Sequence, residues 1–253
     1  MYAAERQQEI LRLARERGRV EVLSLAEEFQ VTPETVRRDL KTLDRGGVIR
    51  RVHGGAIPAG SLAFEPDLAE RETTQAEAKE RIAKAALAEI PNGGSVILDA
   101  GSTTGRLVAA FPLDATVTVV THALPLAARL AEYPGIDLHL VGGRVRHRTR
   151  AAVDSWALRT YAEINADVVF LATNGFSVEG GLTTPDLAES AVKREIISAA
   201  RRVVLLADSS KFEQDHFARF GGVAQLDLLI TDVGLSEESA ESVERQGVEV
   251  ARV

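Results

Sequence analysis

The chain has 253 residues, 45% of them hydrophobic, and a formal net charge of −7 at pH 7. This length fits two domains better than one and leaves enough apolar material for a sizeable core in the larger domain. There is no cysteine, which excludes disulfides and thiolate metal sites, and the five histidines lack ligand spacing, so we expect no metal and no cofactor. No run of 18 apolar residues occurs and the charged N-terminal stretch is unlike a signal peptide, so we expect a cytoplasmic protein without a membrane span.

Three short helices are predicted at the start of the chain. Residues 4–17 form an amphipathic pattern that ends at Gly18, and residues 23–29 form a second short helix followed by a tight connection. Thr32 supplies an N-cap hydroxyl for a third helix, and Pro33 fits its first position, where no backbone N–H is needed. This order is typical of a helix-turn-helix motif.

The third helix carries basic side chains away from its apolar stripe. Val36, Leu40 and Leu43 recur at i, i+4 and i+7 and are predicted to face a core. The glycine pair at 46–47 ends the helix, and residues 48–55 are predicted to form a basic hairpin, or wing. Such a unit presents cations and short polar groups to the major groove of DNA. The predicted DNA-binding residues are Thr32, Pro33, Glu34, Thr35, Arg37, Arg38, Lys41, Arg50, Arg51 and His53.

The distribution of charge is compatible with DNA binding. Residues 1–56 contain eleven Lys and Arg against nine Asp and Glu, a net charge of +2, which leaves nineteen against twenty-eight, a net charge of −9, for the rest. Because affinity for DNA depends largely on phosphate neutralisation, one such unit is expected to bind weakly. We therefore expect a homo-oligomer, a dimer or a tetramer. The alternative is a three-helix bundle with a solvated charged face.

Residues 58–72 are predicted to be a linker. Pro58 and Pro66 interrupt any helical or strand period there, and apolar residues are sparse. We therefore assign residues 1–57 to a winged helix-turn-helix DNA-binding domain and residues 73–253 to a larger domain.

The larger domain alternates strand and helix patterns. Short apolar runs are typical of buried strands, and the segments between them have helical periodicity. The predicted strands lie at 95–100, 116–121, 136–143, 167–173, 203–208, 228–231 and 248–253, and the predicted helices at 75–89, 102–111, 124–132, 186–200 and 236–246. This alternation predicts an α/β domain with a largely parallel sheet covered on both faces.

A hydroxyl-rich loop follows the first predicted strand of this domain. In parallel sheets, ligands bind where the carboxyl ends of strands enter helices. Gly101 allows close approach of the backbone, and the hydroxyls of Ser102, Thr103 and Thr104 lie at a helix start, where amide groups favour a phosphate. The alternative is an ordinary N-cap with a turn glycine.

Three further strand ends carry polar loops. The second loop begins at Thr121, the third contains Asn174 and Gly175, and the fourth ends at Lys211. Lys211 is either a partner for the same anion or a surface cation after a capping turn. Together the loops predict a pocket for a phosphorylated, hydroxyl-rich molecule.

Two features of the larger domain have more than one interpretation. Glu189 and Lys193 lie four residues apart on a helix, so they form either a surface ion pair or contacts to sugar hydroxyls. Residues 144–150, RVRHRTR, would place four arginines on one face of a strand. A phosphate contact, a subunit contact or solvation would each explain that face, and solvation is the expectation.

Several stretches match a known family. They are ERQQEIL and VTPETVRRDLKTLDRGGVIRRVHGGA near the N-terminus, and LDAGSTT, LVGG, GLTTPDLAESAVKREII and LLADSSKF in the larger domain. Through them the chain resembles the DeoR-type bacterial transcriptional repressors over nearly its whole length. The resemblance implies a winged helix-turn-helix joined to a sensor domain with the fold of sugar-phosphate isomerases. It also implies binding of double-stranded operator DNA as an oligomer and a response to phosphorylated sugars.

The resemblance also implies roles for single residues. Ser102, Thr103, Thr104 and Lys211 would hold the phosphate, and Asp99, Asn174 and either Glu189 or Lys193 would contact the sugar. The opening MYA-ER and the wing RRVHGGA resemble an actinobacterial subgroup that controls genes of sugar uptake and phosphorylation, which favours a fructose phosphate as effector.

The chain departs from the family and from the related isomerases at two loops. The family commonly has Thr-Asn-Ser or Thr-Asn-Ala where this chain has Thr121-His122-Ala123. The isomerases use carboxylates in the loop that matches residues 172–175, and this chain has none there. Without a positioned base and acid, the pocket is expected to bind a sugar phosphate without turning it over.

The sequence therefore predicts a repressor of sugar uptake or catabolism genes that a phosphorylated sugar relieves, and not an enzyme. One alternative is an isomerase-like enzyme with a DNA-binding head. Another is a constitutive DNA-binding protein whose larger domain only oligomerises.

Overall fold

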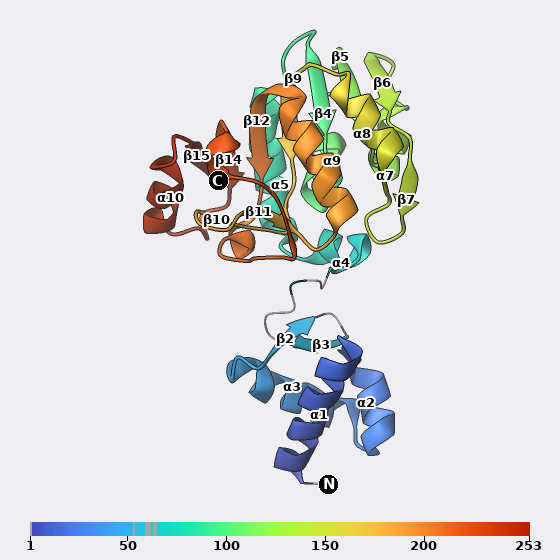
Figure 1. The fold of residues 1–253 in the computed structure, drawn as a ribbon, viewed down its shortest axis with the longest axis vertical. Helices are drawn as coiled ribbons and strands as arrows, with labels where there is room; N and C mark the ends of the chain where they lie inside the picture. The colour runs from blue at the N-terminus through green and yellow to red at the C-terminus, as the bar shows by residue number, and fades with distance from the viewer. Residues whose placement is uncertain (1, 53, 59–61, 63–64) are drawn as a thin grey trace. The chain divides into compact units, whose positions relative to one another are not determined.

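The chain forms two compact units, Met1–Pro66 and Asp67–Val253, here called the N-terminal and C-terminal units. The structure is a computed structural model that describes residues 2–52, 54–58, 62 and 65–253 (Figure 1). Strand β3 (Gly55–Pro58) and helix α4 (Leu68–Thr73) both enter the range 58–72 that was predicted to be a linker. The boundary between the two units lies between β3 and α4, at residues 66 and 67.

The described residues of the N-terminal unit form three helices and a three-stranded sheet. Its elements are α1 (Ala3–Arg17), β1 (Val20–Glu21), α2 (Val22–Phe29), α3 (Pro33–Arg45), β2 (Ile49–Val52) and β3. The strands pair antiparallel in the order β1-β3-β2. The helix-turn-helix and the hairpin after it are thus confirmed, and strand β1 adds to them.

The apolar stripes of the helices form the core of this unit. Val36 and Leu40 of α3 are buried and pack with Ile10 of α1, Leu25 of α2 and Ile49 of β2. The predicted stripe of the third helix therefore faces the core, which leaves its basic face outward.

The C-terminal unit is built on a seven-stranded sheet in the order β15-β14-β12-β9-β4-β5-β6. Each neighbouring pair is parallel. The strands are β4 (Ser95–Leu98), β5 (Val117–Thr121), β6 (Ile136–Leu140), β9 (Ala166–Leu171), β12 (Ala200–Leu206), β14 (Leu228–Thr231) and β15 (Glu249–Arg252). All seven predicted strands are present, and the parallel sheet is confirmed.

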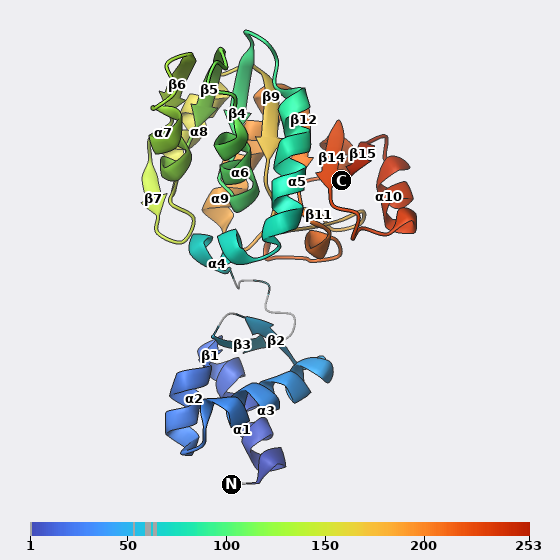
Figure 2. The same ribbon diagram turned by 180° about the vertical axis from the view of Figure 1, so that it is seen from behind.

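Helices cover both faces of this sheet. Helices α8 (Ser155–Ala162) and α9 (Leu187–Ser198) cover the face of the sheet that is turned toward the viewer in Figure 1. Helices α5 (Ala76–Ala86) and α6 (Ser102–Ala110) cover the opposite face, which is turned toward the viewer in Figure 2. One apolar cluster lies against α8 and α9 and a second against α5, α6 and α7 (Leu124–Leu130). A further helix, α10 (Glu237–Glu244), packs on the first cluster. Among the described residues, no helix is long and apolar enough to cross a membrane.

Two small sheets near the strand ends were not predicted. One has the order β10-β11-β13, from strands β10 (Gly175–Ser177), β11 (Gly181–Thr184) and β13 (Ala218–Gly221). The other pairs β7 (Arg144–Arg146) with β8 (Ala151–Val153). The strand considered for residues 144–150 therefore ends at Arg146, and a turn follows. The alternation does not place four arginines on one strand face.

Candidate functional site

Helix α3 and the hairpin present the predicted DNA-binding residues. The Oγ1 atom of Thr32 accepts a hydrogen bond from the backbone N–H of Thr35 (3.2 Å), which confirms the predicted N-cap. The exposed residues of the set are Thr32, Glu34, Arg37, Arg38, Lys41, Arg50 and Arg51; Pro33 and Thr35 are half-buried, and His53 lies outside the described residues. The outward face of α3 and the hairpin therefore offer cations at two neighbouring elements.

A hollow of about 500 Å³ in the N-terminal unit brings three arginines together. Arg37 of α3, Arg51 of β2 and Arg19, which precedes β1, all line it. The backbone N–H of Arg51 donates to Oδ1 of Asp44 (3.1 Å), which fixes the hairpin against α3. Arg19 was not among the predicted residues, because its place beside the hairpin depends on the β1–β3 pairing.

A small pocket forms in the C-terminal unit where the β4–α6 turn meets the ends of β9 and β12. Its volume is about 20 Å³. It is lined by Arg71, Lys79, Gly101, Ser102, Thr103, Ala172, Thr173, Leu206, Ala207, Asp208 and Lys211. The structure thus brings together the four predicted residues Gly101, Ser102, Thr103 and Lys211.

The turn that enters α6 is built to approach a ligand closely. A side-chain carbon at Gly101 would lie 2.8 Å from Cβ of Ala172, so only glycine fits without a shift. Gly101 is the N-cap residue of α6 and has no side chain, so it makes no side-chain hydrogen bond to the first backbone N–H groups of the helix. Those groups, and the hydroxyls of Ser102 and Thr103, are suited to the oxygens of an anion.

Cations outnumber carboxylates around the small pocket. Lys79 of α5 is 3% exposed, and its Nζ donates to the carbonyl oxygens of Arg71 (2.7 Å) and Thr74 (2.8 Å). Burial lowers the pKa of Lys79 to about 8, against the opposing effect of Asp208, whose Oδ2 lies 4.0 Å from Nζ. Nε and Nη2 of Arg71 are buried and have no hydrogen-bond partner within the described part of the chain. With Lys211, these groups favour a ligand that carries negative charge and several oxygens.

Asp99 and Lys193 form a buried ion pair beside this pocket. Nζ of Lys193 lies 2.5 Å from Oδ2 of Asp99 and donates to the carbonyl of Ala172 (2.8 Å). The same carboxylate accepts from the backbone N–H groups of Ala100 and Ala172 (2.8 Å each). Asp99 is fully buried and Lys193 is 4% exposed. The pair therefore ties the turn after β4 to the turn after β9.

The side chain at the unusual loop position, His122, faces the same pair. Its Nε2 lies 3.7 Å from Oδ1 of Asp99, and its Nδ1 lies 2.9 Å from the hydroxyl of Tyr161 on α8. Burial lowers the pKa of His122 and raises that of Tyr161, so both side chains are neutral at pH 7. His122 is 2% exposed and packs edge-on against the Tyr161 ring.

Glu189 is buried and pairs away from Lys193. Its Oε1 lies 2.6 Å from Nη1 of Arg146 and also accepts a hydrogen bond from the Thr149 hydroxyl. Because Glu189 and Lys193 are 5% and 4% exposed, the surface ion pair considered for them is wrong. Arg146 likewise is not a solvated arginine, since it binds Glu189 and Asp186. The positions of Arg146 and Glu189 in the sequence do not predict that they form an ion pair.

The remaining predicted residues shape the loops from beneath. The hydroxyl of Thr104 donates to the carbonyl of Gly101 (2.9 Å), and that of Thr121 donates to the carbonyl of Leu98 (2.8 Å). Asn174 is 7% exposed, and its Oδ1 accepts from the hydroxyl of Thr184 (2.9 Å). Gly175 lies so close to residue 214 that a side-chain carbon would sit 2.0 Å from its carbonyl oxygen. These four residues lie around the pocket without lining it.

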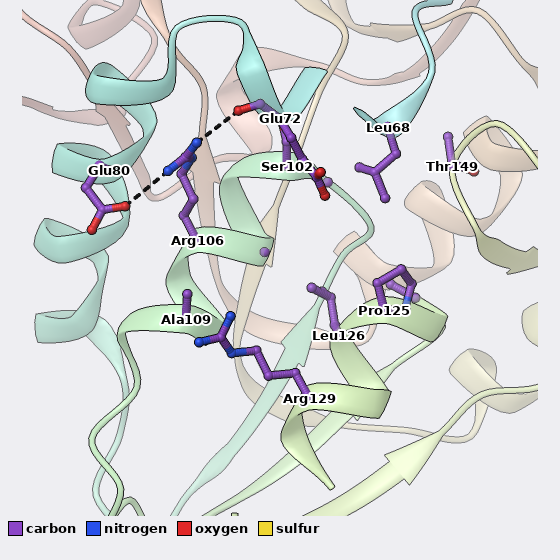
Figure 3. Close-up of a pocket in the computed structure, with 13 residues that line it drawn as sticks. Leu68, Glu72, Glu80, Ser102, Arg106, Ala109, Pro125, Leu126, Arg129 and Thr149 are labelled. Carbon is purple, nitrogen blue, oxygen red and sulfur yellow. Dashed lines mark hydrogen bonds and ion pairs between the residues drawn. The ribbon is translucent and has the colours of Figure 1, made fainter. Parts of the chain in front are cut away.

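A large cavity of about 360 Å³ adjoins the small pocket through Gly101 and Ser102, which line both. Figure 3 shows its walls: Leu68 and Glu72 of α4, Glu80 of α5, Arg106 of α6, and Leu126 and Arg129 of α7. Nη2 of Arg106 donates to the carbonyl of Glu72 (2.9 Å), and Nη1 lies 3.3 Å from Oε2 of Glu80. The two spaces together form a partly open site at the carboxyl edge of the sheet.

Two cations of the site were missed by the sequence reasoning. Lys79 lies on the buried stripe of α5 with Ile82, Ala83 and Ala86, at i, i+3, i+4 and i+7. A lysine inside an apolar stripe is a signal that would have identified it. Arg71 gave no such signal, since it lies in the range predicted to be a linker. Among the described residues, no group of carboxylates and histidines is placed to hold a metal ion.

Both units match models of one family. Residues 6–61 match the DeoR-like helix-turn-helix domain, and residues 74–233 match the DeoR C terminal sensor domain. The chain is 38% identical over 250 residues to the HTH-type transcriptional regulator GlpR of Haloferax volcanii, which covers 99% of this chain and 98% of that protein. It is 32% identical over 232 residues to the glycerol-3-phosphate regulon repressor of Escherichia coli, which covers 92% of each.

Among solved structures, ribose 5 phosphate isomerase A from Neisseria gonorrhoeae matches 55% of each chain, with a TM-score of 0.40 and 19% identity. The named relatives are regulators of Haloferax volcanii and Escherichia coli. The resemblance to an actinobacterial subgroup therefore stays a prediction from the sequence.

Proposed function

Because this chain belongs to the DeoR family of transcriptional regulators, we propose that it represses genes of sugar uptake or catabolism and that a phosphorylated sugar relieves this repression. The observation that supports the effector is the small pocket, where Arg71, Lys79 and Lys211 face a helix start and a single carboxylate, Asp208. A phosphoryl group carries about two negative charges and several acceptor oxygens, which suits this balance.

In this proposal Ser102, Thr103 and Lys211 contact the phosphoryl group. The sugar occupies the large cavity, whose volume of about 360 Å³ is typical of small-molecule sites. Asp99 and Lys193 position the site without contacting the phosphoryl group, because their ion pair holds the turns after β4 and β9 that line the small pocket. A fructose phosphate is the effector that we propose to test first.

The DNA-binding part of the proposal rests on α3 and the hairpin. Helix α3 enters the major groove with Arg37, Arg38 and Lys41 outward, and Arg50 and Arg51 of β2 contact phosphates. One N-terminal unit neutralises few phosphates, so the active species is a dimer or a tetramer that binds paired half-sites in the cytoplasm.

Relief of repression requires the effector to prefer one arrangement of the oligomer. A ligand that binds the DNA-bound and the released arrangements equally well shifts nothing, however tightly it binds. The sugar phosphate must therefore make contacts in the C-terminal unit that the DNA-bound form lacks.

A thermal-shift screen against sugar phosphates, including fructose 1-phosphate and fructose 6-phosphate, tests this function. Binding to the native state raises the unfolding temperature, and the ligand found is then titrated into a gel shift with operator DNA. We expect stabilisation and release of the DNA. Conversion of aldose to ketose phosphates would instead support the isomerase-like alternative. Absence of both stabilisation and release with every compound would support the constitutive one.

A further inference from the structure

Helix α4 closes one side of the small pocket with Arg71, whose Nε and Nη2 atoms have no acceptor among the described residues. Arg71 of α4 lines the pocket together with Ser102, Thr103 and Lys211. Its Nε and Nη2 atoms are buried and unpartnered among the residues that the structure describes. Buried guanidinium N–H groups without an acceptor are unfavourable, and a phosphoryl oxygen is an acceptor of matching charge and geometry.

The small pocket must enlarge to admit a phosphoryl group. Its volume of about 20 Å³ holds roughly one water molecule. Most of its walls are turns that continue β4, β9 and β12 of the parallel sheet, and the buried pair of Asp99 and Lys193 holds the first two of these turns together. The wall from α4 is different, because it is a helix of six residues.

Polar contacts hold α4 in place. The N–H of Leu68 donates to the carbonyl of Arg148 (3.1 Å), and Arg106 donates to the carbonyl of Glu72 (2.9 Å). Lys79 holds the end of the helix through the carbonyls of Arg71 and Thr74. A phosphoryl group in the pocket would compete with those two carbonyls for the Lys79 ammonium, so its binding loosens the end of α4.

We infer that Arg71 binds the phosphoryl group of the effector and that α4 moves when it does, which couples the pocket to the DNA-binding unit. Helix α4 begins at Leu68, two residues after Pro66, the last residue of the N-terminal unit. A displacement of α4 therefore acts directly on the segment that leads to that unit. This inference rests on the proposed function and adds to it the residue that transmits the signal.

The test uses inorganic phosphate as the probe and the full-length protein. Affinity is measured by isothermal titration calorimetry, and hydrogen–deuterium exchange follows the backbone of residues 66–74 with and without saturating phosphate. The variant is Arg71→Gln, with Arg71→Lys as the conservative change. Arg81→Gln is the matched control, because Arg81 is an exposed arginine on the neighbouring helix α5. Lys211→Ala removes a pocket cation that does not lie on α4.

We expect Arg71→Gln to weaken phosphate binding by about tenfold or more, since it removes charged hydrogen bonds, and Arg71→Lys to recover part of this loss. Arg81→Gln should bind like the wild type. At equal saturation, phosphate should change the exchange of residues 66–74 in the wild type and in Lys211→Ala, and change it less in Arg71→Gln, where only the competition for Lys79 remains.

Two outcomes would overturn the inference alone. One is wild-type phosphate affinity in Arg71→Gln, and the other is unchanged exchange of residues 66–74 in the saturated wild type. Failure of the wild type to bind either inorganic phosphate or any sugar phosphate would instead overturn the proposed function, and this inference with it.

Discussion

Replacing Lys79 with methionine is expected to change how the stability of the C-terminal unit depends on pH. The side chain is 3% exposed, and burial lowers its pKa from 10.5 to about 8. Between these values the unfolded chain binds more protons than the folded one, so stability rises with pH. The buried ammonium lowers the free energy of unfolding by its full amount below pH 8, and this destabilisation disappears as the pH rises toward 10.5.

The size of this effect follows from the two pKa values. Because its pKa is lowered on folding, Lys79 reduces the free energy of unfolding by about 3 kcal/mol at pH 7 and by about 2 kcal/mol at pH 9. The wild type should therefore gain about 1 kcal/mol relative to Lys79→Met between pH 7 and pH 9. Loss of the hydrogen bonds to Arg71 and Thr74 changes the absolute stability of the variant, whereas the difference between the two pH values isolates the titration.

Urea unfolding at both pH values measures this difference. The single tryptophan, Trp156, lies on α8 and reports on unfolding of the C-terminal unit. Lys84→Met is the matched control, because Lys84 is an exposed lysine on the same helix as Lys79. Its pH profile should follow the wild type. Identical pH profiles for the wild type and Lys79→Met would refute the argument that Lys79 is a buried, destabilising cation.

Three further changes test other parts of the structure. Lys211→Ala should weaken binding of the sugar phosphate by about tenfold or more, measured by calorimetry, and leave operator affinity without ligand unchanged. Arg38→Ala should reduce operator affinity by about 1–3 kcal/mol in a gel shift, and a loss that differs between operator sequences would mark a base contact. Asp39 is 3% exposed and binds Arg6 at 2.5 Å, so Asp39→Ala should destabilise the N-terminal unit by about 3 kcal/mol. Hydrogen exchange of residues 3–45 checks this, and unchanged protection there would contradict it.

The N-terminal unit was predictable because its signals are local. The Thr32 cap, the stripe of Val36 and Leu40, and the Gly18 stop each act within one or two turns of a helix. The five inner strands of the parallel sheet were predictable for a similar reason, since each contains a short apolar run that is buried in the fold. Strand ends agree with the predicted ones to within a few residues.

The pocket was only partly predictable, because its chemistry depends on which loops meet. The β4–α6 turn and Lys211 could be recognised from strand-end composition. The partners of Glu189 could not, since Arg146 reaches it from a hairpin 43 positions away in the chain. Arg71 could not be recognised either, because only the folded chain places α4 beside the strand ends that form the pocket. The small strands β10, β11 and β13 have too few residues to show a period.

A crystal structure of the protein with the sugar phosphate that stabilises it most would decide where the phosphoryl group binds. We predict its oxygens within about 2.7–3.2 Å of the Ser102 and Thr103 donors and of the Lys211 ammonium. A phosphoryl group bound elsewhere, with the β4–α6 turn contacting only water, would contradict the effector site proposed here.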